Sequence, residues 1–403
     1  MKKILSLILV LCFVLSLCAC TKTPAKPGEK NESSEESKPT VSYADEVFAP
    51  ARTYSKNAVA KKRTLSNTVY KLKTDKKLNV LYYGGSVTVG VGSSSGNSWA
   101  QKSEAWLKET YPDAEINCTN SAIGGTGVYY GNMRADSAVF AHKPDLLFIE
   151  FALNDKYEAF YYAQSAYYLE MLIKRVNKEL PQTDVVILFS TDKGKMGEKY
   201  ENMAAYKDVA DHYGIPCIDM GAELKKAVDN GTGSWEDYIV DYAHPNDMGY
   251  AAYATAVING LKKLLAVEGK KPTDHTLPKE DFIVSGINMD YKLVDFSKIK
   301  VADTWEVGKR KYHSFTSLLR PLETGAKFTY EFEGNSIGVF MSTEKGNTVI
   351  ATIDGKEKTY VVTPDAEVDN EKLIFDNLAE GTHKIEIEYK GTKRFYIYAM
   401  FVG

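Results

Sequence analysis

Four polar residues of this chain could perform acyl transfer if the fold brings them together. Ser86 and Asn154 each follow a short apolar run. Asp241 and His244 are three residues apart, shortly before the last helical segment. A serine hydroxyl becomes a nucleophile when a neutral imidazole takes its proton, and a carboxylate orients that imidazole. These residue types predict Ser86 as a nucleophile, His244 as its base and Asp241 as the group that orients the base.

A site of this kind also needs preorganised donors for the oxyanion, whose loss typically costs about 100- to 1,000-fold in rate. Residues 120–127 read Asn-Ser-Ala-Ile-Gly-Gly-Thr-Gly, a glycine-rich loop whose backbone N–H groups could face an anion. The alternative interpretation of Ser86 is a helix cap, because serine after a glycine turn is common at helix starts. The residues further along the chain favour the nucleophile.

Short β-rich runs alternate with helical segments before about residue 269. The runs are bounded by glycine, proline or asparagine and lie at 78–83, 116–123, 146–152, 185–191 and 215–220. Helices are expected at 99–110, 161–179, 200–212, 220–228 and 248–265. This alternation predicts a parallel sheet covered by helices on both faces. The carboxyl ends of such strands meet at one edge, where the four polar residues could converge.

The pattern changes after residue 269 to short runs of β-branched and aromatic residues, several of them alternating at period two. They lie at 328–333, 336–340, 348–353, 360–362, 373–375, 384–389 and 395–398. This pattern favours an all-β domain, either a sandwich or a jelly roll. The predicted organisation is a signal peptide at 1–19, a disordered tether at 20–45, an α/β domain at 46–268, a linker at 269–280 and an accessory β domain at 281–403. Residues 46–77 are expected to be a helix or an irregular lead-in.

The blocks around the four polar residues resemble the SGNH (GDSL-type) hydrolase family over about residues 76–268. The resemblance implies a three-layer α/β/α sandwich with a flavodoxin-like parallel sheet. It implies a serine esterase that uses no cofactor, with Ser86, Asp241 and His244 as catalytic residues. It further implies an oxyanion hole formed by the N–H groups of Ser86 and Gly125 and by the side-chain amide of Asn154.

Two positions depart from the family pattern. Gly85 stands where the family's name motif has aspartate, and Ala152 stands where the third block usually has glycine. Neither change removes a functional group. We expect Gly85 to change the local support of the turn and Ala152 to narrow the site near Asn154.

The first twenty residues have the pattern of a secretory signal. Three residues, Met-Lys-Lys, precede an apolar run at 4–17 that is too short to span a bilayer. The run ends at Leu-Cys-Ala-Cys, which resembles the lipobox of bacterial lipoproteins, so Cys20 is the predicted lipidated residue. A stretch rich in lysine, glutamate, serine and proline follows, which cannot bury enough surface to fold. The sequence thus predicts a protein exported and lipid-anchored to the outer face of a bacterial cell membrane.

Charge and cysteine usage narrow the remaining possibilities. The formal net charge is −3 and the lysines are scattered among acids, which argues against nucleic acid as a partner. No histidine or cysteine pair has metal-ligand spacing, so no metal is implied. In a flavodoxin-like strand order, Cys118 and Cys217 would lie at opposite edges of the sheet, which predicts two free buried thiols.

Several other side chains could be mistaken for, or belong to, the predicted site. Ser94 satisfies the pattern Gly-x-Ser-x-Gly but lies well past the strand end, so it is interpreted as a loop residue. The histidines other than His244 are expected to be surface or turn residues. Five aromatic residues are expected near the site edge, either stacking on sugar rings or simply packing: Trp99, Tyr129, Tyr130, Tyr157 and Trp235.

The function predicted from these observations is an extracellular esterase that hydrolyses small acyl esters, acetyl above all, on carbohydrate through an acyl-enzyme. The acylated carbohydrate and the membrane are its expected partners. Three alternatives stay open: a lipase or thioesterase acting on acyl chains, a polysaccharide O-acetyltransferase, and a non-catalytic glycan-binding surface protein. The sequence carries no signal for the oligomeric state.

Overall fold

The computed structural model describes residues 54–403 except 56–61, 159–161, 232, 284–290, 313–314, 356–357, 365–367 and 376–377. The predicted signal peptide, the lipidation site Cys20 and the tether lie outside the described residues, as does His313. Within the described residues, no helix combines the length and apolar character that crossing a membrane requires.

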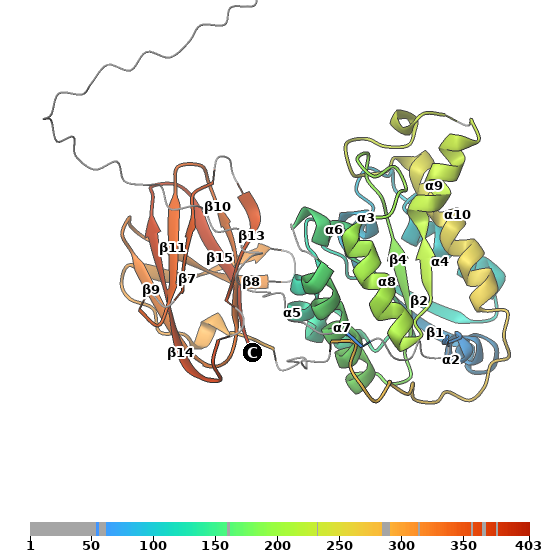
Figure 1. The fold of residues 1–403 in the computed structure, drawn as a ribbon, viewed down its shortest axis with the longest axis horizontal. Coiled ribbons are helices and arrows are strands. Elements are labelled where there is room, and N and C mark those ends of the chain that lie inside the picture. Colours follow the sequence, from blue (N-terminus) through green and yellow to red (C-terminus); the bar gives the residue numbers. More distant parts are fainter. Residues whose placement is uncertain are drawn as a thin grey trace, which may run out of the picture. The chain divides into compact units, whose positions relative to one another are not determined.

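A five-stranded parallel sheet forms the centre of the first domain (Figure 1). Its strands are β1 (Lys77–Gly84), β2 (Glu115–Asn120), β3 (Leu146–Glu150), β4 (Asp184–Phe189) and β5 (Cys217–Asp219). They pair in the order β2-β1-β3-β4-β5, and every pair is parallel. The flavodoxin-like order and the α/β/α fold class predicted from the sequence are therefore confirmed. The central strands read as continuous apolar runs because both of their faces are covered.

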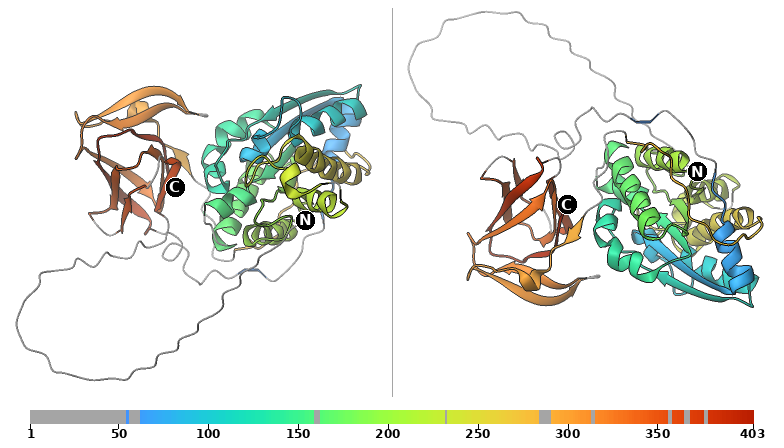
Figure 2. Two further views of the ribbon diagram at one scale, coloured as in Figure 1. Left: turned by 90° about the horizontal axis from the view of Figure 1, so that it is seen from above. Right: turned by 90° about the horizontal axis from the view of Figure 1, so that it is seen from below.

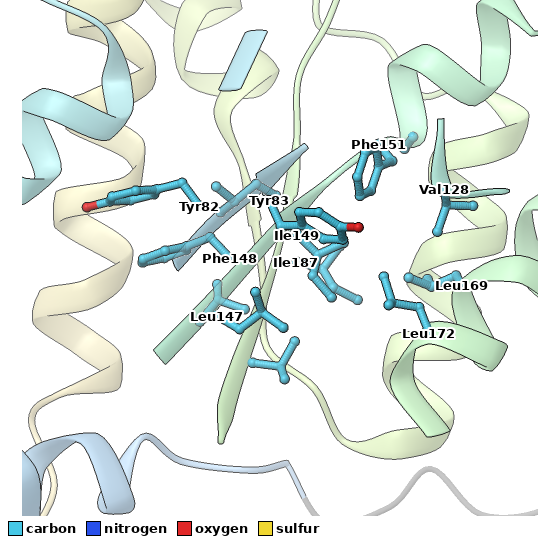
Figure 3. Close-up of a cluster of buried hydrophobic side chains, with 14 of the residues drawn as sticks. Tyr82, Tyr83, Val128, Leu147, Phe148, Ile149, Phe151, Leu169, Leu172 and Ile187 are labelled. Carbon is cyan, nitrogen blue, oxygen red and sulfur yellow. The ribbon is translucent and has the colours of Figure 1, made fainter. Parts of the chain in front are cut away.

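The helices form two groups, one on each face of the sheet (Figures 1 and 2). One group consists of α5 (Val128–Ala138), α6 (Ala152–Tyr157), α7 (Tyr162–Glu179) and α8 (Glu201–Tyr213). The other consists of α4 (Trp99–Thr110), α9 (Met220–Asp229) and α10 (Asp247–Leu264). Alternate side chains of the strands point to opposite faces: Tyr82 stacks on Phe148 on one face, and Tyr83 meets Phe151 edge-on on the other (Figure 3).

Short helices flank β1, and those before it lie in the segment expected to be a helix or an irregular lead-in. The lead-in contains α2 (Ser66–Tyr70) and a π-helical turn (Lys71–Asp75) directly before β1. Ser86–Val89 forms α3, a single turn after β1. Helix α5 begins directly after the glycine-rich loop, in a segment for which no element was predicted. It contains a glycine, an asparagine and an arginine that are all buried, so its sequence lacks the one-sided apolar pattern of a surface helix.

Residues 291–403 form a second, antiparallel β domain in their described part. One sheet has the order β13-β10-β15-β8-β7, with β6 (Lys292–Leu293) added on β15, and the other has the order β12-β11-β14-β9. The strands are β7 (Trp305–Tyr312), β8 (Phe315–Pro321), β9 (Lys327–Gly334), β10 (Ile337–Thr343), β11 (Thr348–Ile353), β12 (Lys358–Val362), β13 (Val368–Phe375), β14 (Gly381–Lys390) and β15 (Phe395–Val402). This arrangement confirms the predicted all-β sandwich. Strands β7 and β8 were not predicted, because charged residues interrupt the alternation of β7 and the residues of β8 do not alternate at period two.

The segment predicted as a linker is bonded to the α/β domain along its length. Thr273 exchanges hydrogen bonds with Asn67, and His275 Nε2 lies 3.0 Å from Asp184 Oδ1. The backbone N–H groups of Phe282 and Ile283 both donate to the Glu170 carboxylate. Residues up to 283 therefore extend the α/β domain rather than leaving it at 268.

The two cysteines of the described chain are free. Cys118 lies on β2 and Cys217 on β5, the two edge strands of the parallel sheet. Their free state agrees with the prediction, but both are half-buried rather than buried. Edge strands have one unpaired side, which explains this difference.

Candidate active site

The turn that carries Ser86 is closely packed at both preceding glycines. A Cβ atom added to Gly84 would lie 2.4 Å from Thr88 Oγ1 and 2.5 Å from the carbonyl oxygen of Glu150. A Cβ atom added to Gly85 would lie 1.9 Å from Asn154 Oδ1. A side chain at Gly84 would clash with backbone, so this position requires glycine, whereas a side chain at Gly85 would have to displace the Asn154 side chain. The turn delivers Ser86 to the carboxyl edge of the sheet, as its first helical residue after β1.

His244 connects Ser86 to Asp241 through its two ring nitrogens. His244 Nε2 lies 2.8 Å from Ser86 Oγ, and His244 Nδ1 lies 2.7 Å from Asp241 Oδ2. The loop is closed by a bridge between Ile239 and Pro245, and Asn246 caps the following helix α10. The predicted serine, imidazole and carboxylate therefore form one continuous hydrogen-bonded chain, brought together from positions 158 residues apart.

The Asp241 carboxylate also organises the backbone of its own loop. Its Oδ1 accepts hydrogen bonds from the N–H groups of Ala243 and His244, each at 2.8 Å. Partial burial opposes its ionisation, but the hydrogen bonds from the His244 ring and from these N–H groups outweigh that effect. The pKa of Asp241 consequently lies below its ordinary value, and the carboxylate stays charged beside the imidazole.

Asn154 is the third residue of α6, four residues past the end of β3, and its side chain packs over Gly85. It is 8 % exposed. No hydrogen bond joins its side-chain amide to another described residue. The amide is thus held beside the nucleophile turn by packing, with its donors available to a ligand.

The glycine-rich loop lies against Ser86. A Cβ atom at Gly124 would be 3.6 Å from Ser86 Cβ, and Gly125 follows with φ +69°, a conformation that favours glycine. Asp155 holds the far end of this loop: its Oδ1 accepts from Val128 N, the first residue of α5, at 2.8 Å. Asp155 is buried and its role is structural.

A buried carboxyl group that was not predicted lies directly behind the nucleophile turn. Glu150 is the last residue of β3 and pairs in register with Gly84. It accepts hydrogen bonds from Thr88 Oγ1 at 2.9 Å and from Ser190 Oγ at 2.6 Å. Burial raises the pKa of Glu150 to about 7, because these hydrogen bonds offset only part of the desolvation. The sequence did contain a signal for this residue, because Glu150 is a glutamate at the end of an otherwise apolar strand.

The five aromatic residues expected near the site edge differ in how far they are exposed to solvent. Trp99, Tyr129 and Tyr130 are buried: Trp99 packs on Tyr82, and Tyr129 packs on Tyr168. Trp235 is half-buried against the core. Tyr157 alone is exposed. The first three are packing residues and cannot stack on a sugar.

The remaining candidates take structural positions. Ser94 lies in an exposed loop, where its N–H and hydroxyl both bond to Asp247. The expectation of surface histidines was wrong for His212 and His383, which are buried and hydrogen-bonded to Glu280 O and Asp354 respectively. No cluster able to hold a metal ion occurs among the described side chains.

A parallel sheet of this order with a hydrogen-bonded serine, histidine and aspartate at its carboxyl edge defines an SGNH-type serine hydrolase. Comparison with known families gives the same result: residues 82–252 match the GDSL-like Lipase/Acylhydrolase family. The match covers most of the α/β domain. No curated protein matches the chain.

Solved structures extend the similarity to both domains. A two-domain esterase (CEX) active on acetylated mannans, co-crystallized with mannopentaose, matches with a TM-score of 0.70 at 20 % identity, covering 85 % of this chain and 95 % of that chain. The same protein without the ligand gives the same score. Axe2, an acetylxylan esterase from Geobacillus stearothermophilus, matches at a TM-score of 0.41 and 18 % identity, covering 47 % of this chain and 95 % of that chain. At these identities the match to the two-domain esterase shows a shared fold.

Proposed function

We propose that this protein is an esterase that removes acetyl groups from an acetylated polysaccharide, with a mannan-type backbone as the first candidate. The observation that carries the proposal is the chain from Ser86 Oγ through His244 to Asp241, with distances of 2.8 and 2.7 Å. The two-domain fold shared with an esterase active on acetylated mannans supports the choice of substrate.

The proposed reaction has two steps. His244 Nε2 takes the proton of Ser86 as Oγ attacks the acetyl carbonyl, and the protonated imidazole then gives that proton to the departing sugar oxygen. His244 next takes a proton from water, which attacks the acetyl-serine, and the imidazolium returns this proton to Ser86 Oγ as the ester bond breaks and acetate leaves. The oxyanion of each tetrahedral intermediate is proposed to accept hydrogen bonds from the N–H groups of Ser86 and Gly125 and from the Asn154 amide.

The experiment is an ester panel measured on wild type, Ser86→Ala and Ser94→Ala. The panel contains acetylated mannan, acetylated xylan and acyl esters of increasing chain length. Acetate release by wild type and by Ser94→Ala, and none by Ser86→Ala, is expected. Ser94→Ala is the matched control, because Ser94 is the other serine with a nucleophile-like motif. Activity that survives in Ser86→Ala would overturn the mechanism.

A second candidate is hydrolysis of longer acyl chains. Apolar side chains are exposed beside the catalytic segments: Val89, Val91, Val240 and Met248. They could contact an acyl chain as readily as a sugar. Activity that rises with acyl length in the same panel would favour this candidate. Transfer of acetyl to an acceptor glycan instead of water would appear as acetylated acceptor in place of free acetate.

We also propose that the enzyme is exported and anchored to the outer face of a bacterial membrane through lipidated Cys20, which fits a polymeric substrate outside the cell. Cys20→Ser is expected to release the protein from the membrane fraction when expressed with its own leader. Continued membrane association of this variant would refute lipidation at Cys20.

A further inference from the structure

The exposed aromatic side chains of the described structure are confined to one place. The chain contains 27 tyrosines, and among those whose side chains are described only Tyr157 and Tyr242 are exposed, at 49 % and 53 %. No described phenylalanine or tryptophan is exposed. Tyr157 lies one helical turn after Asn154 in α6, and Tyr242 lies between Asp241 and His244. Both tyrosines therefore lie beside the catalytic residues Ser86, His244 and Asp241.

Tyr157 is held in place before any ligand arrives. Its hydroxyl donates to Asp192 Oδ2 at 2.8 Å, and the Asp192 side chain is fully buried. Lys156 pairs with the same carboxylate oxygen and lies over the Tyr157 ring, 5.0 Å from its centroid. A fixed ring loses little conformational entropy when it binds a ligand, which is the advantage of a preorganised contact.

Tyr242 packs against the loop that directly follows Asp192. Its carbonyl oxygen accepts from Lys193 N at 2.8 Å. A Cβ atom at Gly194 would lie 2.1 Å from the Tyr242 hydroxyl, so the absence of a side chain at Gly194 leaves the space that this hydroxyl occupies. Burial and the nearby groups Asp192, Tyr242 and Asp241 raise the pKa of Tyr157, which agrees with both rings lying near the catalytic carboxylate.

The surroundings of the two rings are those of a ligand site. Every large apolar side chain that is exposed in the described α/β domain lies in a segment around the catalytic chain: Val89, Val91, Tyr157, Met196, Val240, Tyr242 and Met248. Apolar and aromatic surface gathered in this way marks a binding site on a soluble domain. A pyranose has an apolar C–H face and a rim of hydroxyls, which matches a tyrosine ring beside polar groups.

We propose that Tyr157 and Tyr242 form a saccharide subsite beside Ser86, in which their rings hold the sugar units next to the acetylated one. Asp192 acts as the positioning residue that fixes Tyr157, and the backbone of the next two residues, Lys193 and Gly194, packs against Tyr242. The inference rests on the proposed polysaccharide esterase function and adds the surface that selects a polymer over a small ester.

The test compares acetylated mannooligosaccharide with 4-nitrophenyl acetate, which has no sugar to bind. Tyr157→Ala and Tyr242→Ala are each expected to lose about tenfold more kcat/KM on the oligosaccharide than on the small ester, mainly through KM, as for loss of one aromatic anchor. Tyr157→Phe keeps the ring and should retain most of the preference. Leu322→Ala, an equally exposed apolar substitution in the β domain, should leave both activities unchanged.

Two other outcomes are distinguishable. Equal losses on the two substrates, or no loss on either, would overturn the subsite while leaving the esterase intact. Wild type that cleaves 4-nitrophenyl acetate but no acetylated saccharide would overturn the proposed substrate class, and the subsite with it. A binding measurement decides independently of turnover: Ser86→Ala should bind the oligosaccharide, and Ser86→Ala with Tyr157→Ala should bind it about tenfold more weakly.

Discussion

Asn154 Oδ1 occupies the space that a side chain on residue 85 would need: a Cβ atom there would lie 1.9 Å from this oxygen and 2.5 Å from Asn154 Cγ. The departure from the family's name motif at Gly85 is thus coupled to the placement of the Asn154 amide beside Ser86. In this chain the glycine is not merely tolerated, because any larger residue must displace the amide proposed to hold the oxyanion.

Gly85→Ala is therefore expected to lower kcat by about 100-fold or more, as removal of an oxyanion donor does. Asn154→Ala should lower it by a similar factor. The decisive measurement is the double variant: once Asn154 is alanine, its amide atoms are gone and the extra methyl meets none of them. Gly85→Ala should then cost little more. Fully additive losses would mean that Gly85 acts through something other than Asn154.

Asp241→Asn tests the orienting role of the carboxylate. The asparagine oxygen can still accept from Ala243 N and His244 N, so the loop should keep its shape. Its amide nitrogen would instead donate to His244 Nδ1, which forces the imidazole into the tautomer that presents an N–H to Ser86. A loss of about 10,000-fold in kcat with an unchanged melting temperature is expected. A loss below about tenfold would show that His244 is oriented by other groups.

Glu150 should make stability depend on pH. Its folded pKa, about 7, lies above its ordinary value of 4.5, so the folded state keeps a proton that the unfolded chain has already lost. The contribution of Glu150 to the free energy of unfolding is then fully present below pH 4.5. It decreases as the pH rises from 4.5 to 7, and above pH 7 up to about 3 kcal/mol has been lost.

The comparison that isolates this effect is wild type against Glu150→Gln, by urea unfolding between pH 4.5 and 8. Glutamine can keep one hydrogen bond as an acceptor and donate to the other hydroxyl, because Ser190 and Thr88 accept as well as donate. The variant should lack the fall and be the more stable protein at pH 8. Parallel pH curves for the two proteins would show that Glu150 does not titrate in this range.

The sheet and the catalytic chain were predictable because each depends on local pattern. Strands β1, β3 and β4 are continuous apolar runs, and Ser86, Asp241 and His244 follow or precede such elements at recognisable spacings. Helix α5 was not predictable, because its polar Asn132 and Arg134 are buried and hydrogen-bond to the backbone of Tyr168 and Ser121, which lie outside the helix. Its helical state is decided by packing rather than by its own periodicity.

The residues that surround the catalytic residues could not be predicted for the same reason. Glu150 is bonded to Ser190, and Tyr157 to Asp192, across 40 and 35 residues of sequence. Neither pair belongs to a spaced motif. The sequence also could not separate Tyr157 from Tyr129 and Tyr130, because exposure and burial differ among them only through the neighbours that the fold supplies.

The strand order gives a last prediction, on the thiols. Cys118 and Cys217 lie on strands separated by three others, roughly 19 Å apart at ordinary strand spacing, whereas a disulfide needs Cα atoms within about 7 Å. Burial raises the pKa of Cys118 to about 11 and that of Cys217 to about 12, which suppresses the reactive thiolate. A chain beginning after Cys20 should therefore give two alkylated cysteines when denatured without reductant, and slow alkylation when native. Denatured protein that takes up no alkylating reagent until it is reduced would contradict the strand order itself.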